Sequence, residues 1–186
     1  CPSCKKIDDE EGSFSGSLIH FINKLAARFP DKEIATLAYL YTMNPPKNIK
    51  PLPNVVIMLC DIDSKREVAL TENASGQYFM KALEGWSAIS NNLFVWDYGI
   101  NFDNYLSPFP NFHILQPNIR TFRDHHVHMH FSQIASNRGG DFAELRTYLV
   151  SKLMWNPDID VDATMQFFLN HYYGEAGHYI YRYLKM

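Results

Sequence analysis

Apolar and polar residues follow two different periods along this chain, and these periods predict helices and strands in turn. In residues 16–29 the apolar positions recur at helical spacing, and Pro30 follows them and ends the helix. The runs 34–41 and 54–60 are instead almost continuously apolar and rich in β-branched or aromatic residues, which is typical of strands buried on both faces. We therefore expect one helix followed by two buried strands.

The same alternation continues to the end of the chain. We expect strands at residues 93–98 and 127–133 and helices at 77–90, 117–124, 142–154, 161–172 and 175–185. Pro117 is expected to open its helix, and Asp141 and Asp160 are expected to cap the helices that follow them. Gly174 is expected to separate the last two helices.

Strands that alternate with helices predict an α/β fold with parallel strand pairing. A doubly wound sheet is the rival fold, but the chain contains neither G-x-G-x-x-G nor G-x-x-x-x-G-K-[ST]. A complete (β/α)₈ barrel takes roughly 250 residues, and this chain has 186. We therefore predict the C-terminal half of a TIM barrel in residues 1–155, followed by a helical extension packed on the barrel in residues 156–186.

Charge and hydropathy exclude two classes of partner. The formal net charge is −3 at pH 7, so no basic excess supports nucleic-acid binding. No apolar run approaches the ~18 residues that a membrane-spanning helix needs. We therefore expect neither a nucleic-acid partner nor a membrane span.

The three cysteines are too few for a disulfide framework. Cys1 and Cys4 form a C-x-x-C motif, but no second ligand pair follows at the spacing of a zinc site. Cys60 ends an apolar run and is expected to be a small buried residue. We expect no bound metal and no cofactor.

Aromatic residues and carboxylates gather at the predicted carboxyl ends of the strands, where α/β proteins place their active sites. The residues at these ends are Tyr39, Tyr41, Asp61, Asp63, Trp96, Asp97, Tyr98, Ser132 and Gln133. Aromatic rings stack on the apolar faces of sugars, and glycosidic cleavage needs two carboxylates. A phosphate site would instead show Gly-rich turns with Lys or Arg. The pattern therefore predicts a carbohydrate site.

Asp97 is the strongest catalytic candidate, because it stands between two aromatic residues at the end of an apolar strand. Partial burial there favours the protonated carboxyl group and suits acid–base catalysis, and the alternative is a structural carboxylate that accepts backbone N–H bonds. Asp61 is the expected second carboxylate, with the start of a polar loop as its alternative. The expected substrate contacts are Tyr39, Tyr41, Trp96, Tyr98 and Gln133. For the two tyrosines before the second strand, the alternative is core packing.

His126, His128 and His130 alternate along a predicted strand and therefore share one face. Neighbours two apart are roughly 7 Å from each other, so one ion takes two of them at most and needs further ligands. If Gln133 points into the site, Phe131 does so too, and the three histidines face the helices. Structural histidines are favoured, and a metal-dependent hydrolase stays an alternative.

Three segments, 37–62, 86–112 and 141–177, together with the Cys1-x-x-Cys4 motif, resemble the bacterial domain of unknown function 4838 (DUF4838). The resemblance spans nearly the whole chain. It implies a glycoside-hydrolase-like TIM barrel of the kind found in gut Bacteroidetes, with the N-terminal half of the barrel missing from this chain. It also implies a periplasmic, cell-surface or secreted location for the full-length protein.

The last of these segments is also similar to the tail of xylan-degrading α-glucuronidases. In those enzymes the acid comes from the fourth strand and the bases from the sixth and seventh. By position, Asp61 follows the presumed sixth strand. Asp97 lies at the end of the presumed seventh strand.

The combined expectation is a glycoside hydrolase that acts on an oligosaccharide or polysaccharide through carboxylate acid–base chemistry. One alternative is a carbohydrate-binding domain without catalysis, and another is the metal-dependent hydrolase that uses strand histidines. Half a barrel also leaves two open sheet edges with unpaired backbone groups, so self-association or poor solubility is expected.

Overall fold

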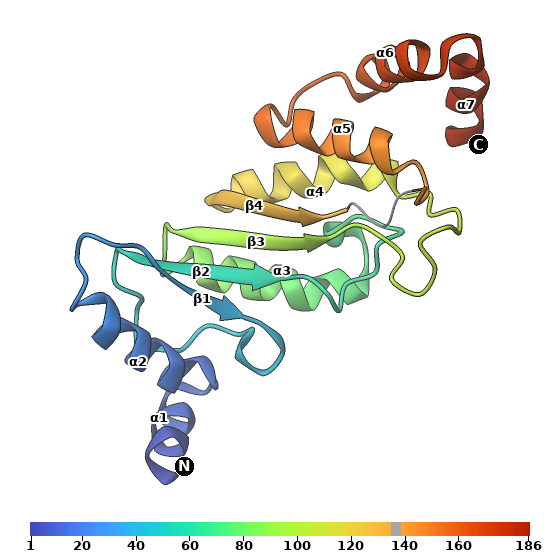
Figure 1. Ribbon diagram of the computed structural model, residues 1–186. Coiled ribbons are helices and arrows are strands. Elements are labelled where there is room, and N and C mark those ends of the chain that lie inside the picture. The colour runs from blue at the N-terminus through green and yellow to red at the C-terminus, as the bar shows by residue number, and fades with distance from the viewer. Residues whose placement is uncertain (135–138) are drawn as a thin grey trace. The chain divides into compact units, whose positions relative to one another are not determined.

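The computed structural model describes residues 1–134 and 139–186, and a four-stranded parallel sheet runs through it (Figure 1). The strands are β1 (Ile34–Ala38), β2 (Val55–Cys60), β3 (Leu93–Tyr98) and β4 (Val127–Gln133), in the order β1-β2-β3-β4. Each strand lies beside its predecessor, whereas a doubly wound sheet reverses its order at a switch point. The predicted fold class, half of a (β/α)₈ barrel with helices at its C-terminal end, is confirmed.

The helices occur largely where the apolar periodicity predicts them. They are α1 (Pro2–Glu11), α2 (Ser15–Ala26), α3 (Ala74–Ser87), α4 (Phe112–Asp124), α5 (Ala143–Trp155), α6 (Val161–Tyr173) and α7 (Gly177–Leu184). The predicted N-cap of α6 is confirmed, because Asp160 Oδ1 accepts the N–H of Ala163 at 2.9 Å. Gly174 separates α6 from α7, as expected, with a φ of 57°.

Two predicted helix starts are wrong. Pro117 lies inside α4, which begins at Phe112, because buried Ile114 and Leu115 extend the apolar face upstream of the proline. Asp141 does not cap α5. Instead Phe142 is the N-cap residue, and the Asp141 carboxylate accepts the N–H of Phe109 at 3.0 Å. An ion pair with a buried arginine therefore replaces the expected helix cap.

That arginine is Arg146, which is 1% exposed and lies 3.2 Å from Asp141 Oδ2. Burial lowers the pKa of its guanidinium to about 10, although the charge of Asp141 and their hydrogen bond act in the opposite direction. Arg146 also donates to Asn111 and to the carbonyl of Phe109. These bonds fix the loop between β3 and α4.

The chain forms two compact units, and the division passes through β3 and β4. The first, here called the sheet unit, comprises Cys1–Lys65, Leu70–Asp97 and Phe122–Phe131. The second, here called the helical unit, comprises Arg66–Ala69, Tyr98–Thr121 and Ser132–Met186. The predicted domain boundary between residues 155 and 156 stays a prediction.

Among the described helices, none combines the length and the apolar character that crossing a bilayer requires.

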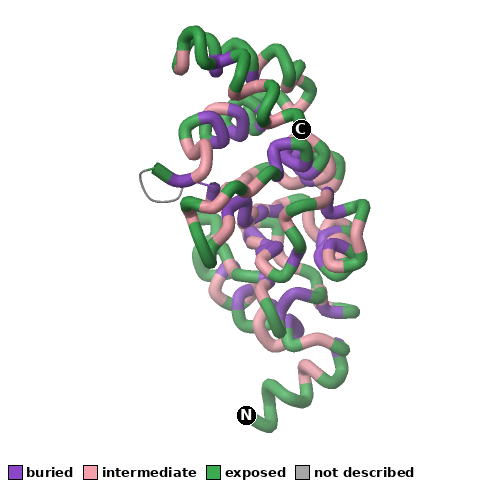
Figure 2. Tube along the Cα trace, turned by 90° about the vertical axis from the view of Figure 1, so that its right-hand side faces the viewer, coloured by how far each residue is buried: buried purple, intermediate pink, exposed green. Residues whose placement is uncertain are grey.

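In the sheet unit, α1 lies largely in solvent and is fixed at its end by Glu11 (Figure 2). The Glu11 side chain is buried, and its Oε2 accepts the backbone N–H groups of Asn48 at 2.6 Å and Ile49 at 3.1 Å. Burial alone would raise the pKa of Glu11, but these hydrogen bonds outweigh it and hold the pKa below its usual value. Glu11 is therefore ionised, and its carboxylate connects α1 to the segment between β1 and β2.

The two faces of the sheet differ in burial. On one face the strand residues are fully buried: Ile57, Leu59, Leu93 and Val95, which pair in register across β2 and β3. This face is covered by helices, since Phe122 of α4 contacts Phe79 of α3 at 6.2 Å and His130 of β4 at 5.3 Å, measured between ring centroids. We call it the helix-covered face.

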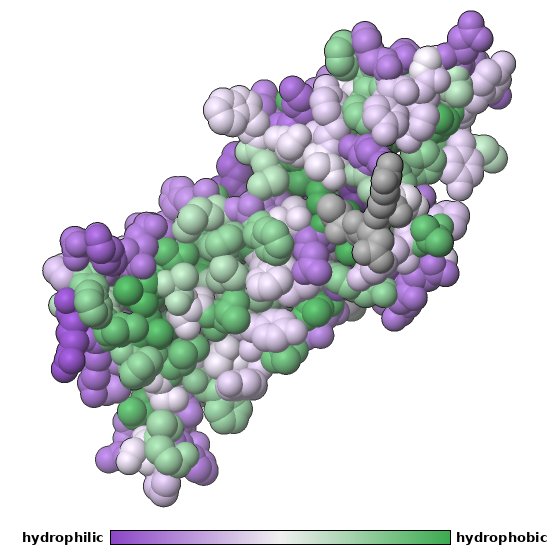
Figure 3. All heavy atoms as spheres, in the orientation of Figure 1, coloured by the Kyte–Doolittle hydropathy of each residue, from purple (hydrophilic) through white to green (hydrophobic). Residues whose placement is uncertain are grey.

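The opposite face, here called the open face, carries large apolar side chains that remain partly exposed. Its members are Leu37, Met58, Phe94, Trp96 and Phe131. Leu37 is 42% and Phe131 45% exposed. Figure 3 shows hydrophobic residues, in green, gathered over the sheet on the side that faces the viewer. On this face the large side chains therefore remain partly in solvent, although the smaller Val56 and Cys60 among them are 2% exposed.

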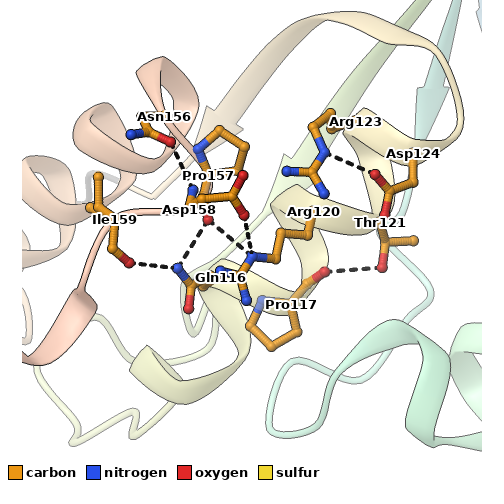
Figure 4. Close-up of polar contacts among 10 residues, drawn as sticks. All are labelled: Gln116, Pro117, Arg120, Thr121, Arg123, Asp124, Asn156, Pro157, Asp158 and Ile159. Carbon is orange, nitrogen blue, oxygen red and sulfur yellow. Dashed lines mark hydrogen bonds and ion pairs between the residues drawn. The ribbon is translucent and has the colours of Figure 1, made fainter.

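In the helical unit, two side chains of α4 hold the segment that joins α5 to α6 (Figure 4). Gln116 Nε2 donates to the carbonyls of Pro157 and Ile159, both at 2.9 Å. Arg120 Nε donates to the Pro157 carbonyl at 3.1 Å and pairs with Asp158 at 2.9 Å. The segment is thus bound through its backbone as well as through charge.

In the sheet unit, Trp86 of α3 joins the helix to the connection after β1. Its side chain is 1% exposed, and its indole N–H donates to the carbonyl of Met43 at 2.7 Å. Trp86→Phe keeps most of the buried apolar area but leaves this carbonyl without its donor. We expect the free energy of unfolding to fall by about 1–3 kcal/mol, measured by urea denaturation followed by circular dichroism.

The matched control is Trp155→Phe, because Trp155 is 91% exposed. This change should alter the free energy of unfolding by less than about 0.5 kcal/mol. Equal losses in the two variants would contradict the role given to the Trp86 hydrogen bond.

A second prediction concerns Glu11. Glu11→Gln should lower the free energy of unfolding at pH 7 by about 1–3 kcal/mol, because the charged acceptor of two backbone N–H groups is lost. The folded-state pKa lies below the usual 4.5, so the contribution of Glu11 is complete above that pH and is lost as the pH falls through the folded-state value. The stabilities of the wild type and the variant should therefore converge in acid.

Urea titrations at a series of pH values measure this convergence. Glu10→Gln is the control, because Glu10 is exposed and its (i, i+4) ion pair with Lys6 is long, at 4.0 Å. Such a pair contributes little to stability. A constant difference between wild type and Glu11→Gln at every pH would show that the carboxylate charge is irrelevant.

Candidate functional site

Two hollows flank a pair of exposed aromatic residues at the carboxyl end of β1, in the sheet unit. We call them the paired hollows. The larger has a volume of about 510 Å³ and is lined by Asp8, Asp9, Gly12, Ser13, Phe14, Tyr41 and Asn44. The other measures about 440 Å³ and is lined by Phe14, Ser17, Leu18, Thr36, Leu37, Tyr39, Tyr41 and Thr42. Phe14 and Tyr41 belong to both.

The shared aromatic pair presents its rings to solvent. Phe14 is 59% and Tyr41 74% exposed, and their rings meet edge to face with centroids 5.9 Å apart at an angle of 83°. This geometry is favourable for aromatic pairs and holds each ring in one orientation. Exposed rings held in this way offer an apolar platform beside polar groups on both sides.

The position of Tyr39 and Tyr41 depends on the turn that ends β1. Between them Leu40 has a φ of 49°, a left-handed conformation that a bulky residue adopts only where its surroundings hold it. The hydroxyl of Thr42 accepts the N–H of Tyr39 at 3.2 Å and donates to its carbonyl at 3.0 Å. A further backbone bond runs from the N–H of Thr42 to the Tyr39 carbonyl at 3.1 Å. These bonds stabilise the strained turn.

The wall of the larger hollow is fixed where α1 meets α2. The hydroxyls of Ser13 and Ser15 donate to the carbonyl of Asn44 at 2.7 and 2.6 Å. The N–H of Ser17 donates to Asp8 Oδ1 at 2.8 Å. Together with the Glu11 anchor, these bonds hold the junction against the connection after β1, so the hollow is built by two segments distant in sequence.

Asp97, the predicted acid–base residue, points towards the helices. Its side chain is 13% exposed, and Oδ2 lies 3.4 Å from Nε2 of His130, which contacts Phe122 of α4. The preceding residue, Trp96, contacts Phe131 on the open face with ring centroids 5.2 Å apart. Side chains alternate along strands, so Asp97 and Trp96 face opposite sides of the sheet. The acid–base role of Asp97 stays a prediction, as does the structural alternative.

Asp61, the predicted second carboxylate, follows β2 and is 5% exposed. Its N–H donates to the carbonyl of Trp96 at 3.3 Å, and its own carbonyl accepts the N–H of Ser64 at 2.9 Å. These backbone bonds place Asp61 at the start of a loop, and its role as the second carboxylate stays a prediction. Asp63 is exposed in the same loop.

The remaining predicted contacts lie apart from the paired hollows. Trp96 belongs to the open face of the sheet unit. Tyr98 and Gln133 belong to the helical unit, where the Tyr98 carbonyl accepts from Arg66 Nε at 2.8 Å and the Gln133 carbonyl accepts from the N–H of Gly99 at 3.1 Å. Of the predicted contacts, the structure brings Tyr39 and Tyr41 together in one site. The roles assigned to all of them stay predictions.

Sequence reasoning does not find Asp8, Ser13 or Phe14. They precede the first predicted helix, and only the tertiary contact of the α1–α2 junction brings them to Tyr41. Gly12, whose φ of 65° ends α1, is the single local signal of a helix end in this region.

Among the described residues, the strand histidines do not assemble a metal site. Phe131 lies on the open face and His130 on the helix-covered face, which is the arrangement expected if Gln133 points into a site. Within residues 1–134 and 139–186, no three His, Cys, Asp or Glu side chains come together in a way that could hold a metal ion. The metal-dependent alternative therefore has no ligand set in this part of the chain.

Comparison with known proteins identifies one family. A search of curated proteins and a search of solved structures each gave no match. The profile of the domain of unknown function DUF4838, in contrast, matches residues 1–185. The resemblance drawn from the sequence is thereby confirmed, and the chain belongs to the DUF4838 family.

Proposed function

We propose that this chain binds neutral oligosaccharides or polysaccharides in the paired hollows, as the carbohydrate-binding part of a glycoside-hydrolase-like barrel. The observation that carries the proposal is the exposed edge-to-face pair of Phe14 and Tyr41, which separates two hollows lined by hydroxyl, amide and carboxylate groups. A sugar needs an apolar surface for its C–H face and hydrogen-bond partners around it, and both are present on each side of the pair.

The chemistry of the linings favours an uncharged ligand. Asp8 places a carboxylate along the larger hollow, whereas the charge of Asp9 is compensated by Lys5 at 2.7 Å. Neither lining contains a Lys or Arg among the described residues. An anionic ligand such as a phosphate would find no cationic partner in either lining. Volumes of about 510 and 440 Å³ fall in the usual range of small-ligand sites. Their location at the carboxyl end of a barrel strand is where this architecture binds substrates.

Glycoside hydrolysis by Asp97 and Asp61 is the other proposal for this chain. It requires both carboxyl groups to flank the scissile bond, at roughly 5–5.5 Å for retention or 6.5–9.5 Å for inversion. Asp97 faces His130 and the helix-covered side instead, which supports the non-catalytic alternative within this chain. We expect any general acid of the complete barrel to come from its N-terminal half. Export of the full-length protein stays a proposal drawn from the family.

The binding proposal makes a direct prediction for Tyr41. Tyr41→Ala removes the ring shared by both hollows, and we expect affinity for a bound oligosaccharide to fall at least about tenfold. A panel of soluble neutral polysaccharides and their oligosaccharides, tested by affinity electrophoresis and calorimetry, identifies the ligand and measures the loss.

Tyr179→Ala is the matched control, because Tyr179 is 64% exposed in α7 and lines neither hollow. It should leave binding unchanged. If the wild type binds no member of the panel, or if both variants lose affinity equally, the proposed site is wrong.

Asp97→Asn separates binding from hydrolysis. Because Asp97 faces His130, the variant should keep oligosaccharide affinity within about twofold of the wild type. Release of reducing sugar, measured in parallel, should be absent from both proteins. Turnover by the wild type that Asp97→Asn abolishes would favour the glycosidase proposal over the binding module.

A further inference from the structure

Cys1 and Cys4 form a pair of thiols at the first turn of α1. Their sulfur atoms are 3.3 Å apart, and the N–H of Cys4 donates to the sulfur of Cys1 at 3.5 Å. Both residues are exposed, and Figure 2 shows the N-terminal turn in solvent. The third cysteine, Cys60, is 2% exposed in β2. Two of the three thiols are thus in contact and accessible, and the third is enclosed by the sheet.

We propose that Cys1 and Cys4 are a redox-active dithiol that exchanges with low-molecular-weight disulfides and closes a reversible intramolecular disulfide. The spacing places one cysteine at the N-cap and the other one turn later, so both side chains share one side of the helix end. A disulfide needs α-carbons about 4.4–6.8 Å apart and sulfurs at about 2.05 Å. A rise of about 1.5 Å per residue and a radius of about 2.3 Å put α-carbons three residues apart in a helix about 5 Å from each other, and rotation of the side chains brings the sulfurs together.

The backbone of this turn tolerates the bond. Pro2 occupies the first helical position, where its missing N–H would have no helical partner and its fixed φ already suits the helix. The N–H of Lys5 donates to the carbonyl of Cys1 at 3.0 Å, which closes the turn before any sulfur bond forms. Oxidation therefore joins two groups that the helix already holds together.

The exchange balances through a mixed disulfide. One cysteine gives up its proton, attacks the external disulfide and releases one thiol. The other cysteine gives up its proton and attacks the mixed disulfide, forming the Cys1–Cys4 bond and releasing the second thiol. The two electrons lost by the pair reduce the external disulfide, and excess thiol drives the reverse steps.

Easy reduction follows from the size of the ring. The bond encloses only residues 1–4, and short loops restrict the unfolded chain least, so this disulfide stabilises the fold little. A disulfide of this kind responds to the redox balance of its surroundings. The pair also lies outside the lining of the paired hollows, which begins at Asp8, so its chemistry is independent of sugar binding.

The test equilibrates the full chain in glutathione buffers of increasing oxidised fraction, quenches exchange with acid and measures intact mass. We expect one transition to a species lighter by two hydrogen atoms, with no glutathione adduct. Peptide mapping should assign the bond to Cys1–Cys4, and Cys60 should react with an alkylating reagent only after unfolding.

The variants Cys1→Ser and Cys4→Ser provide the comparison. Each should instead accumulate glutathione on its remaining exposed thiol, and should need at least about tenfold more oxidised glutathione, because no neighbouring thiol acts at high effective concentration. Circular dichroism checks that both variants fold. Three results would overturn the proposal: a wild type that carries two glutathiones, one that stays reduced across the range, or one that bonds between chains.

Discussion

The alternation of side chains along parallel strands is the constraint on which the arrangement of this protein depends. Register fixes Leu59 beside Val95 and Cys60 beside Trp96, so each position on β2 and β3 is committed to one face. Trp96 meets Phe131 on the open face, and Asp97 meets His130 beneath the helices. The side chains of neighbouring residues thus point to opposite faces of the sheet. A ligand on one face contacts only every second side chain of a strand.

Hydrogen bonds to the backbone, rather than packing, complete the region around the paired hollows. The strained Leu40 is held between bonds of Thr42 to Tyr39, and the α1–α2 junction is held by serine hydroxyls and by the Glu11 carboxylate. Charge-assisted bonds to backbone N–H groups are stronger than neutral ones and are directional. Such bonds therefore fix the backbone around a site whose aromatic rings remain exposed.

The sequence predicts the last two strands well and the site only in part, for physical reasons. The expected strand 34–41 is too long, because the left-handed turn at Leu40 ends β1 at Ala38. The bounds of β3 and β4 follow from short apolar runs flanked by polar residues, and the structure has them at Leu93–Tyr98 and Val127–Gln133 as expected. The face of Asp97 does not follow from its own strand, because alternation gives two choices until a contact such as Trp96–Phe131 selects one. Asp8 and Phe14 come to the site through tertiary contact, and the local sequence pattern of residues 1–15 does not predict that contact.

The open face also bears on where a ligand can bind in this architecture. The interior of a (β/α)₈ barrel is packed with layers of large apolar side chains and leaves no pore. Met58, Phe94 and Trp96 are side chains of that kind. Met58 of β2 pairs in register with Phe94 of β3, and Trp96 lies two residues further along β3. Closure of such a barrel would bury this face, whereas the turn that carries Tyr41 lies beyond the end of β1 and would stay in solvent. The larger hollow contains no residue of β1 and is therefore compatible with either state of the sheet. The smaller hollow is lined by Leu37 of the open face, so closure would cover that part of the site.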